Sequence, residues 1–295
     1  MSRARIAALA IAAALAIAGV VVAARTSKDA APCGAGFTRA GARCCPTPGA
    51  ARPGACASAG GDACPSPLVA TAHGCDAPEH DVVEVPETTV VVGPSDWEAE
   101  GRVPPRTVRV GRFALDRLEV SVGRACSDAT LAGAPWCDAS DSARAASGVA
   151  LAKARVFCAA RGGRLPTEDE WLAAAAGERP RRYPWGDTGA VCRRAAWGLE
   201  AGPCAEGARG PDTVGAHPEG ATPLGIHDLA GNVAEWVEVS CPAPSRECPS
   251  VVRGGSWKTT LATELRTWLR REVSADAERG GDPTIGFRCA YDRAP

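Results

Sequence analysis

A chain of 295 residues, 45% of them hydrophobic, has room for a leader, one large domain and a small additional segment. Its net charge is −1 at pH 7, and acidic and basic residues alternate along the chain. This balance removes the electrostatic attraction on which nucleic-acid binding and polybasic membrane contacts depend. We therefore expect no nucleic-acid partner.

The first 25 residues have the pattern of an export signal. Arg3 and Arg5 precede an uncharged, alanine-rich run over 6–24, and Arg25 follows it. A basic start before an apolar run is typical of signal peptides, but this run also approaches the roughly 20 residues that span a bilayer as a helix. Residues 1–25 are predicted to be either a cleaved signal peptide or a retained N-terminal membrane anchor. Both predict an exported protein that is periplasmic or extracytoplasmic, membrane-anchored or secreted.

The 14 cysteines agree with export, because cysteines in an oxidising compartment form disulfides. A zinc site would need paired C-x₂-C or histidine-bearing clusters along the sequence, and neither spacing is present. The four histidines are scattered singly: His73, His80, His217 and His227. Disulfides are therefore the predicted state of the cysteines.

Residues 26–81 form a distinct cysteine-rich segment with few large apolar side chains. Its six cysteines are Cys33, Cys44, Cys45, Cys56, Cys64 and Cys75. So little apolar surface cannot offset the entropy of ordering, so cross-links must stabilise the segment, and six cysteines allow 15 pairings. Two interpretations remain: a disulfide-stapled spacer that holds the main domain away from the membrane, or a small recognition module. The lack of an aromatic or charged cluster favours the spacer.

Residues 82–295 have the pattern of a mixed α+β domain. A helix is predicted over 151–161, ending at a glycine pair. A second helix begins at Thr167, which forms a capping box with Glu170, and runs to Gly177. Alternating apolar residues predict strands over 82–85, 88–92, 106–120, 233–239, 251–257 and 287–291.

Five motifs follow one another in this domain. They are RLPTEDEW at 164–171, YPWGD at 183–187, GIHDLAGNVAEW at 225–236, RGGSW at 253–257 and GFRC at 286–289. In order and spacing they resemble the formylglycine-generating enzyme (sulfatase-modifying factor) domains, over roughly residues 82 to 293. The resemblance implies a loop-rich α+β fold of the C-type-lectin-like type, low in regular secondary structure.

The resemblance also implies where catalytic groups would lie. Formylglycine-generating enzymes bind copper(I) with two thiols shortly after the Gly-Gly-Ser segment, because soft thiolates suit this ion. Thr259 and Glu264 occupy those positions here. A hydroxyl and a carboxylate cannot replace thiolates, so we expect neither copper nor a catalytic thiol. A sulfoxide-forming branch of the superfamily binds iron with histidines, largely from an additional domain, and its His-x₃-His pattern is absent.

A calcium loop and a long-range disulfide are further implications of the resemblance. The calcium ligands would be the Asp228 side chain, the carbonyls of Gly231 and Val233, and the Glu235 carboxylate, a set of hard oxygen donors. Cys158 and Cys289 would join the first long helix to the C-terminal strand. Local bridges are additional hypotheses for three pairs: Cys126–Cys137, Cys192–Cys204 and Cys241–Cys248.

Ser256, Trp257 and Arg288 would lie near the groove that the copper site leaves behind. We therefore expect a pseudoenzyme: a non-oxidase binding or structural protein of the cell envelope, whose groove recognises an unidentified peptide, protein or glycan. The alternative is a divergent oxidoreductase of the same superfamily that acts on a protein cysteine or a small thiol.

Overall fold

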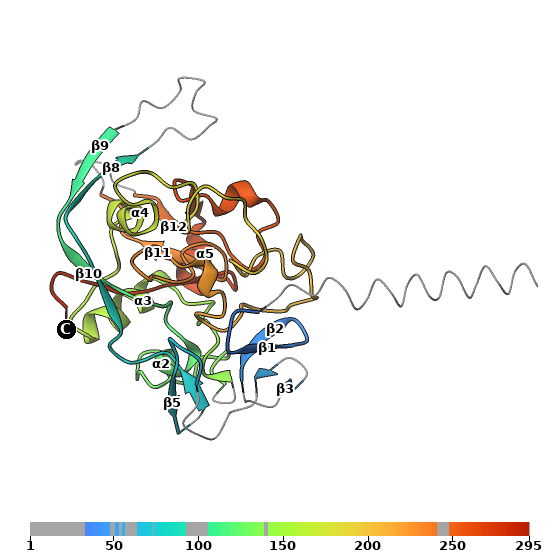
Figure 1. Cartoon of the computed structure of the whole chain (residues 1–295). Helices are drawn as coiled ribbons and strands as arrows, with labels where there is room; N and C mark the ends of the chain where they lie inside the picture. The colour runs from blue at the N-terminus through green and yellow to red at the C-terminus, as the bar shows by residue number, and fades with distance from the viewer. Residues whose placement is uncertain are drawn as a thin grey trace, which may run out of the picture. The chain divides into compact units, whose positions relative to one another are not determined.

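The computed structural model describes residues 33–47, 51–52, 55–56, 64–72, 74–92, 106–138, 141–240 and 248–294, and Figure 1 shows their arrangement. The candidate leader over 1–25 lies outside these residues. Within the described part, no helix is both long and apolar enough to cross a bilayer.

Two small sheets organise the main domain. One has the strand order β15 (Ala290–Tyr291), β10 (Phe113–Asp116), β7 (Val82–Val85), with antiparallel pairing throughout. The other has the order β13 (Arg270–Val273), β12 (Ser250–Arg253), β11 (Ala234–Val237), β14 (Ile285–Gly286). β11 and β14 are parallel, and the remaining pairs are antiparallel. Both sheets therefore take a strand from the C-terminal end of the chain.

A separate hairpin joins β8 (Thr88–Val92) to β9 (Arg106–Val110) and lies beside α4 in Figure 1. The strands predicted over 82–85, 88–92 and 106–120 are thus present. The last of these is two strands, β9 and β10, which belong to different sheets. Val90 and Val110 are buried and belong to the same core cluster as the alanines of α4.

The two predicted helices are present as α3 (Leu151–Ala160) and α4 (Glu168–Ala176). The capping box at α4 is complete: Glu170 N donates to Thr167 Oγ1 at 3.2 Å, and Thr167 N donates to Glu170 Oε2 at 2.8 Å. Shorter helices form as α2 (Val122–Cys126) and α5 (Ala275–Gly280). Their five and six residues are too short to show a helical period in the sequence.

The cysteine-rich segment folds into three small hairpins. These are β1 (Phe37–Ala40) with β2 (Arg43–Pro46), β3 (Ala51–Arg52) with β4 (Ala55–Cys56), and β5 (Val69–Thr71) with β6 (Gly74–Asp76). Three disulfides connect it internally: Cys33–Cys44, Cys45–Cys56 and Cys64–Cys75. Among the 15 pairings, the structure therefore has the one that joins consecutive cysteines.

The segment differs from the predicted separate spacer. Phe37 and Leu68 are buried in one hydrophobic cluster with Leu118 and Val214 of the main domain. Residues from Cys33 onward accordingly form one unit. The few apolar side chains of the segment suffice because the main domain supplies the other half of the core.

Disulfides and large side chains stabilise the interior of the main domain. Cys158 of α3 is bonded to Cys289, and both are fully buried beside Phe157 and Phe287, whose rings meet edge to face. The bridges Cys126–Cys137 and Cys192–Cys204 are also present. Cys248 is disulfide-bonded, and the predicted partner Cys241 lies outside the described residues. None of the described cysteines is free.

Candidate functional site

A groove of about 410 Å³ lies beside β12 and β13, and we call it the basic groove. Its walls come from the end of β12, the Gly-Gly-Ser turn, the loop that follows the turn, and β13. The polar side chains among its lining residues are Arg253, Ser256, Lys258, Thr259, Glu264, Arg270, Arg271 and Thr284. The two positions where the family's copper-binding thiols would stand, Thr259 and Glu264, therefore do line one groove.

The Gly-Gly-Ser turn shapes the floor of this groove. Gly254 and Gly255 have φ angles of +93° and +71°, in the left-handed region that glycine adopts readily. A Cβ on Gly255 would lie 2.8 Å from a methyl of Leu265, so a larger residue would not fit. Ser256 N donates to Thr259 Oγ1 at 2.9 Å. Thr259 thus closes the turn with its hydroxyl, a structural contact in the place expected for a thiol.

Four basic side chains surround the groove. Arg253 is buried, and burial lowers the pKa of its guanidinium, while Glu168 opposes this with an ion pair of 2.8 Å. Arg270 also pairs with Glu168, at 2.9 Å. Lys258 pairs with Glu200 at 3.2 Å on the surface. Arg271 is exposed, and its guanidinium makes no ion pair with any described residue.

Only one of the three predicted groove residues lines the groove. Ser256 does. Trp257 is 2% exposed, and its Nε1 donates to Pro283 O at 3.1 Å, so it is a core residue. Arg288 is fully buried and turns inward to Glu235. Trp257 and Arg288 therefore do not line this groove: the ring of Trp257 is in the core, and the Arg288 guanidinium pairs with Glu235.

The predicted calcium ligand Glu235 is already engaged by hydrogen-bond donors. Its Oε1 accepts from Arg288 Nη2 at 2.7 Å, and its Oε2 accepts from Arg288 Nε and Trp171 Nε1, both at 2.8 Å. Asp228 Oδ2 accepts from Gly215 N at 2.6 Å. A guanidinium therefore already stands against Glu235, where a calcium ion would have to bind.

Three buried carboxylates gather around Arg288. Burial, followed by the charges of Asp228 and Glu235, raises the pKa of Glu119 well above its ordinary value. Glu119 Oε2 accepts from Asn232 Nδ2 at 2.5 Å. A proton on Glu119 relieves the excess negative charge of this cluster. Asp228, Gly231, Val233 and Glu235 do not fit calcium as a set, and we derive no function through this ion.

A second buried polar cluster fastens the cysteine-rich segment to the main domain. Arg43 forms an ion pair with Asp141 and donates from Nη2 to Thr213 Oγ1 at 3.1 Å. Cys44 N donates to Asp212 Oδ1 at 2.8 Å. Burial alone would raise the pKa of Asp212, but contacts from His217, Arg43 and the Cys44 amide lower it. Sequence reasoning missed this cluster, because its members are far apart along the chain.

The fold and the groove together define a loop-rich α+β domain of the formylglycine-generating type. The chain belongs to the sulfatase-modifying factor family, because the family's sequence model, described as "Sulfatase-modifying factor enzyme 1-like domain", matches residues 70–293. This match begins at residue 70, before the domain start expected at residue 82, and includes all but the first residue of the hairpin of β5 and β6.

Curated relatives of the chain include both inactive and active proteins. "Inactive C-alpha-formylglycine-generating enzyme 2" of Bos taurus is 36% identical over 143 residues, which are 46% of this chain and 46% of the relative. "Hercynine oxygenase" of Mycolicibacterium thermoresistibile is 31% identical over 173 residues, 48% of this chain and 34% of the relative. The chain thus spans less than half the length of these relatives.

Solved structures agree on the fold. PvdO from Pseudomonas aeruginosa superposes with a TM-score of 0.58 at 21% identity, over 72% of this chain and 94% of that chain. The Treponema denticola variable protein 1 superposes with a TM-score of 0.54 at 18% identity, over 72% and 95%. The predicted α+β fold of the formylglycine-generating type is confirmed.

Proposed function

We propose that this chain is an exported, non-oxidase binding protein of the cell envelope that holds a peptide or glycan ligand in the basic groove. The oxidising compartment is supported by the six disulfides that join described cysteines. In this proposal the chain keeps the groove of the family but has lost its copper chemistry.

The groove's donor set carries this proposal. Thr259 and Glu264 stand where thiolates would bind copper(I), and Thr259 is used within the turn. No cysteine, histidine or methionine is among the lining residues. Hydroxyl, carboxylate and guanidinium groups are poor ligands for a soft ion. The name of one relative, an inactive formylglycine-generating enzyme, agrees with loss of activity in this family.

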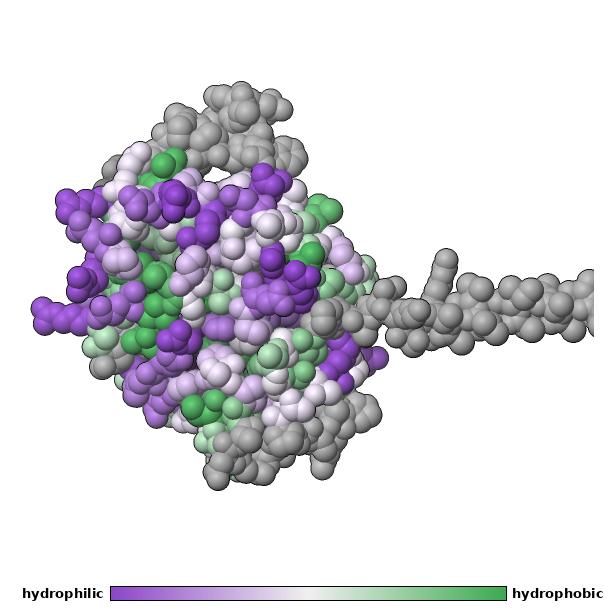
Figure 2. Space-filling model, viewed as in Figure 1, coloured by the Kyte–Doolittle hydropathy of each residue, from purple (hydrophilic) through white to green (hydrophobic). Residues whose placement is uncertain are grey.

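The free groups of the groove favour a ligand that carries a carboxylate. Arg271 is exposed and makes no ion pair within the described part of the chain. The Lys258–Glu200 pair is about half exposed, and such surface pairs contribute little, so a ligand carboxylate can replace Glu200. Leu269 is 38% exposed at the same groove and offers an apolar contact. On the face drawn in Figure 2, hydrophobic and hydrophilic residues are interspersed.

The test uses the full chain, because the cysteine-rich segment shares a core with the main domain. Purified protein is analysed for bound copper and iron, and the mass of a Cys-x-Pro-x-Arg peptide is followed under air. We expect no stoichiometric redox metal and no change in peptide mass. Stoichiometric copper or iron, or oxidation of the peptide thiol, would overturn the non-oxidase proposal and favour the divergent oxidoreductase.

A double variant tests whether the two groove positions correspond to those of the family's copper-binding thiols. The double substitution Thr259→Cys and Glu264→Cys should create copper(I) binding, since both side chains then present thiols to one groove. The wild-type chain under the same loading serves as the control. Equal copper retention by both proteins would show that the groove positions are not those of the family's thiols.

A further inference from the structure

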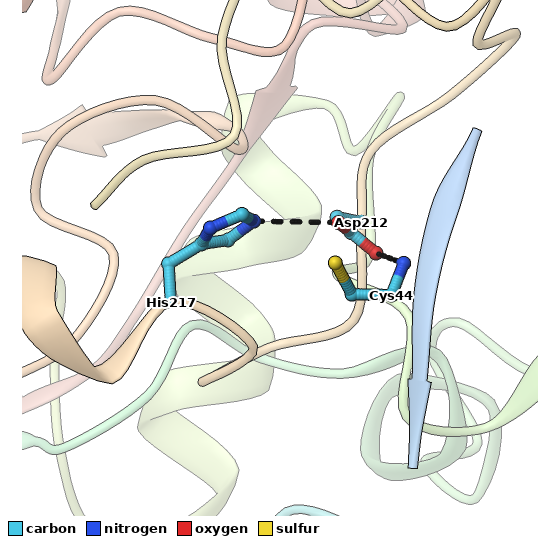
Figure 3. Close-up of side chains that lie close together, drawn as sticks. All are labelled: Cys44, Asp212 and His217. Carbon is cyan, nitrogen blue, oxygen red and sulfur yellow. Dashed lines mark hydrogen bonds and ion pairs between the residues drawn. The ribbon is translucent and has the colours of Figure 1, made fainter. Parts of the chain in front are cut away.

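Three side chains that can ligate a metal meet where the cysteine-rich segment docks on the main domain: Cys44, Asp212 and His217 (Figure 3). One ligand atom of each lies within 4.8 Å of the others, and all three residues are buried. Cys44 belongs to β2, whereas Asp212 and His217 belong to one loop of the main domain. His217 Nε2 lies 3.4 Å from Asp212 Oδ2.

In the oxidised chain Cys44 is not available to a metal, because it is bonded to Cys33. Asp212 uses Oδ1 to accept from the amides of Cys44 and Thr213, both at 2.8 Å, and directs Oδ2 at His217. His217 is only 2% exposed, yet its Nδ1 has no hydrogen-bond partner among the described residues. Nε2 is therefore the ring nitrogen that faces Asp212 and is placed to bind a metal.

We infer that reduction of the Cys33–Cys44 disulfide converts this cluster into a zinc site with Cys33, Cys44, Asp212 and His217 as ligands. Two thiolates, an imidazole and a carboxylate form a donor set that zinc takes in tetrahedral coordination. Bonds of about 2.0 to 2.1 Å to nitrogen and oxygen give a tetrahedral N···O edge of about 3.3 to 3.4 Å. The 3.4 Å between His217 Nε2 and Asp212 Oδ2 has this length.

A dithiol reductant gives two electrons and two protons to the Cys33–Cys44 bond, which opens to two thiols while the reductant becomes a cyclic disulfide. Zinc then displaces both thiol protons into solvent. The neutral His217 ring binds through Nε2, which faces Asp212, and holds its proton on Nδ1. The Cys33 sulfur is adjacent to that of Cys44 in the disulfide, and its thiolate is the fourth ligand that the proposal requires.

Zinc and the disulfide would thus be two alternative cross-links that hold β2 in place. Asp212 Oδ1 keeps its bond to the Cys44 amide in both states, so β2 stays docked while Oδ2 turns to the metal. The competing interpretation is purely structural: Asp212 and His217 hold the backbone of β2, and freeing the thiols creates no metal affinity. Both interpretations predict the same oxidised protein, and they differ once a thiol is present.

Cobalt(II), a spectroscopic substitute for zinc, separates these interpretations in the full chain. The substitution Cys33→Ser frees the Cys44 thiol and leaves the other bridges closed. We expect this variant to bind one Co²⁺ with a thiolate-to-cobalt charge-transfer band that Zn²⁺ abolishes. The matched control is Cys64→Ser, which frees the buried Cys75 in a disulfide with the same sequence separation of 11 but outside the Asp212–His217 cluster.

Adding His217→Ala to the Cys33→Ser variant should weaken Co²⁺ binding at least about tenfold, because a direct ligand is lost. The inference is overturned if Cys33→Ser and Cys64→Ser bind Co²⁺ equally, or if His217→Ala leaves the affinity unchanged. Wild-type chain gives an independent measurement should the variants misfold. After dithiol reduction, zinc should protect Cys33 and Cys44 from alkylation, as measured by peptide mass, and equal labelling with and without zinc would also refute the site.

Discussion

Removing the Cys158–Cys289 disulfide should destabilise the protein more than removing any local bridge. The cysteines are 131 residues apart, whereas Cys192 and Cys204 are 12 apart. A cross-link restricts the unfolded chain by an amount that grows with the logarithm of the loop length, which gives about 5 kcal/mol for the long loop and about 3 kcal/mol for the short one. The expected difference in the free energy of unfolding is therefore about 2 kcal/mol.

The assay compares two double variants, Cys158→Ala with Cys289→Ala and Cys192→Ala with Cys204→Ala, by urea unfolding followed through tryptophan fluorescence. Both are refolded under oxidising conditions so that the remaining bridges form. Cys158 and Cys289 are fully buried, so the cavity left by their sulfur atoms adds to the loss. Equal losses, or a larger loss for the short loop, would refute the loop-entropy reasoning.

Further predictions concern the buried polar groups and the docked segment. Glu235→Gln leaves the fully buried Arg288 without its partner charge and should cost about 3 to 5 kcal/mol in urea unfolding. Phe37→Ala should cost a similar amount, about 3 to 5 kcal/mol, because Phe37 is buried against the main domain, while Val69→Ala at a 42% exposed position should change stability little. Asp212 has a lowered pKa, so its contribution is present above its ordinary value of 3.8 and is lost as the pH falls through the lower folded value. The free energy of unfolding that Asp212→Asn loses relative to the wild-type chain, measured in urea, should therefore be largest near neutral pH. This loss should shrink at pH values well below 3.8. A calcium chelator should leave the melting temperature unchanged, because Arg288 already neutralises Glu235, and a clear drop on chelation would reinstate the calcium loop.

Local signals in the sequence predicted the parts of the fold that depend on neighbouring residues. The capping box needs only Thr167 and Glu170, three positions apart, and it forms as predicted. Strand alternation likewise located the β8–β9 hairpin. The order and spacing of five motifs identified the family, and with it the Cys158–Cys289 bridge, which no local pattern indicates.

The errors concern contacts between distant segments. The docking of the cysteine-rich segment depends on Leu118 and Val214, which lie outside it, so the composition of the segment alone suggested a free spacer. The inward direction of Arg288 depends on Glu235, 53 positions away. The calcium loop was implied by the family resemblance and stays a prediction, and the guanidinium that contacts Glu235 comes from another part of the chain.

For a chain that is exported as proposed, the connectivity of the disulfides bears on the order in which they form. Five of the six bridges between described cysteines join consecutive cysteines 11 or 12 positions apart. An oxidase that pairs cysteines in the order in which they enter its compartment would form these bridges correctly at once. Cys158 must instead remain unpaired until Cys289 arrives, after Cys192 and Cys204 have passed. Among the six described bridges, Cys158–Cys289 is therefore the pairing that forms late and for which a disulfide isomerase would have a wrong partner to correct.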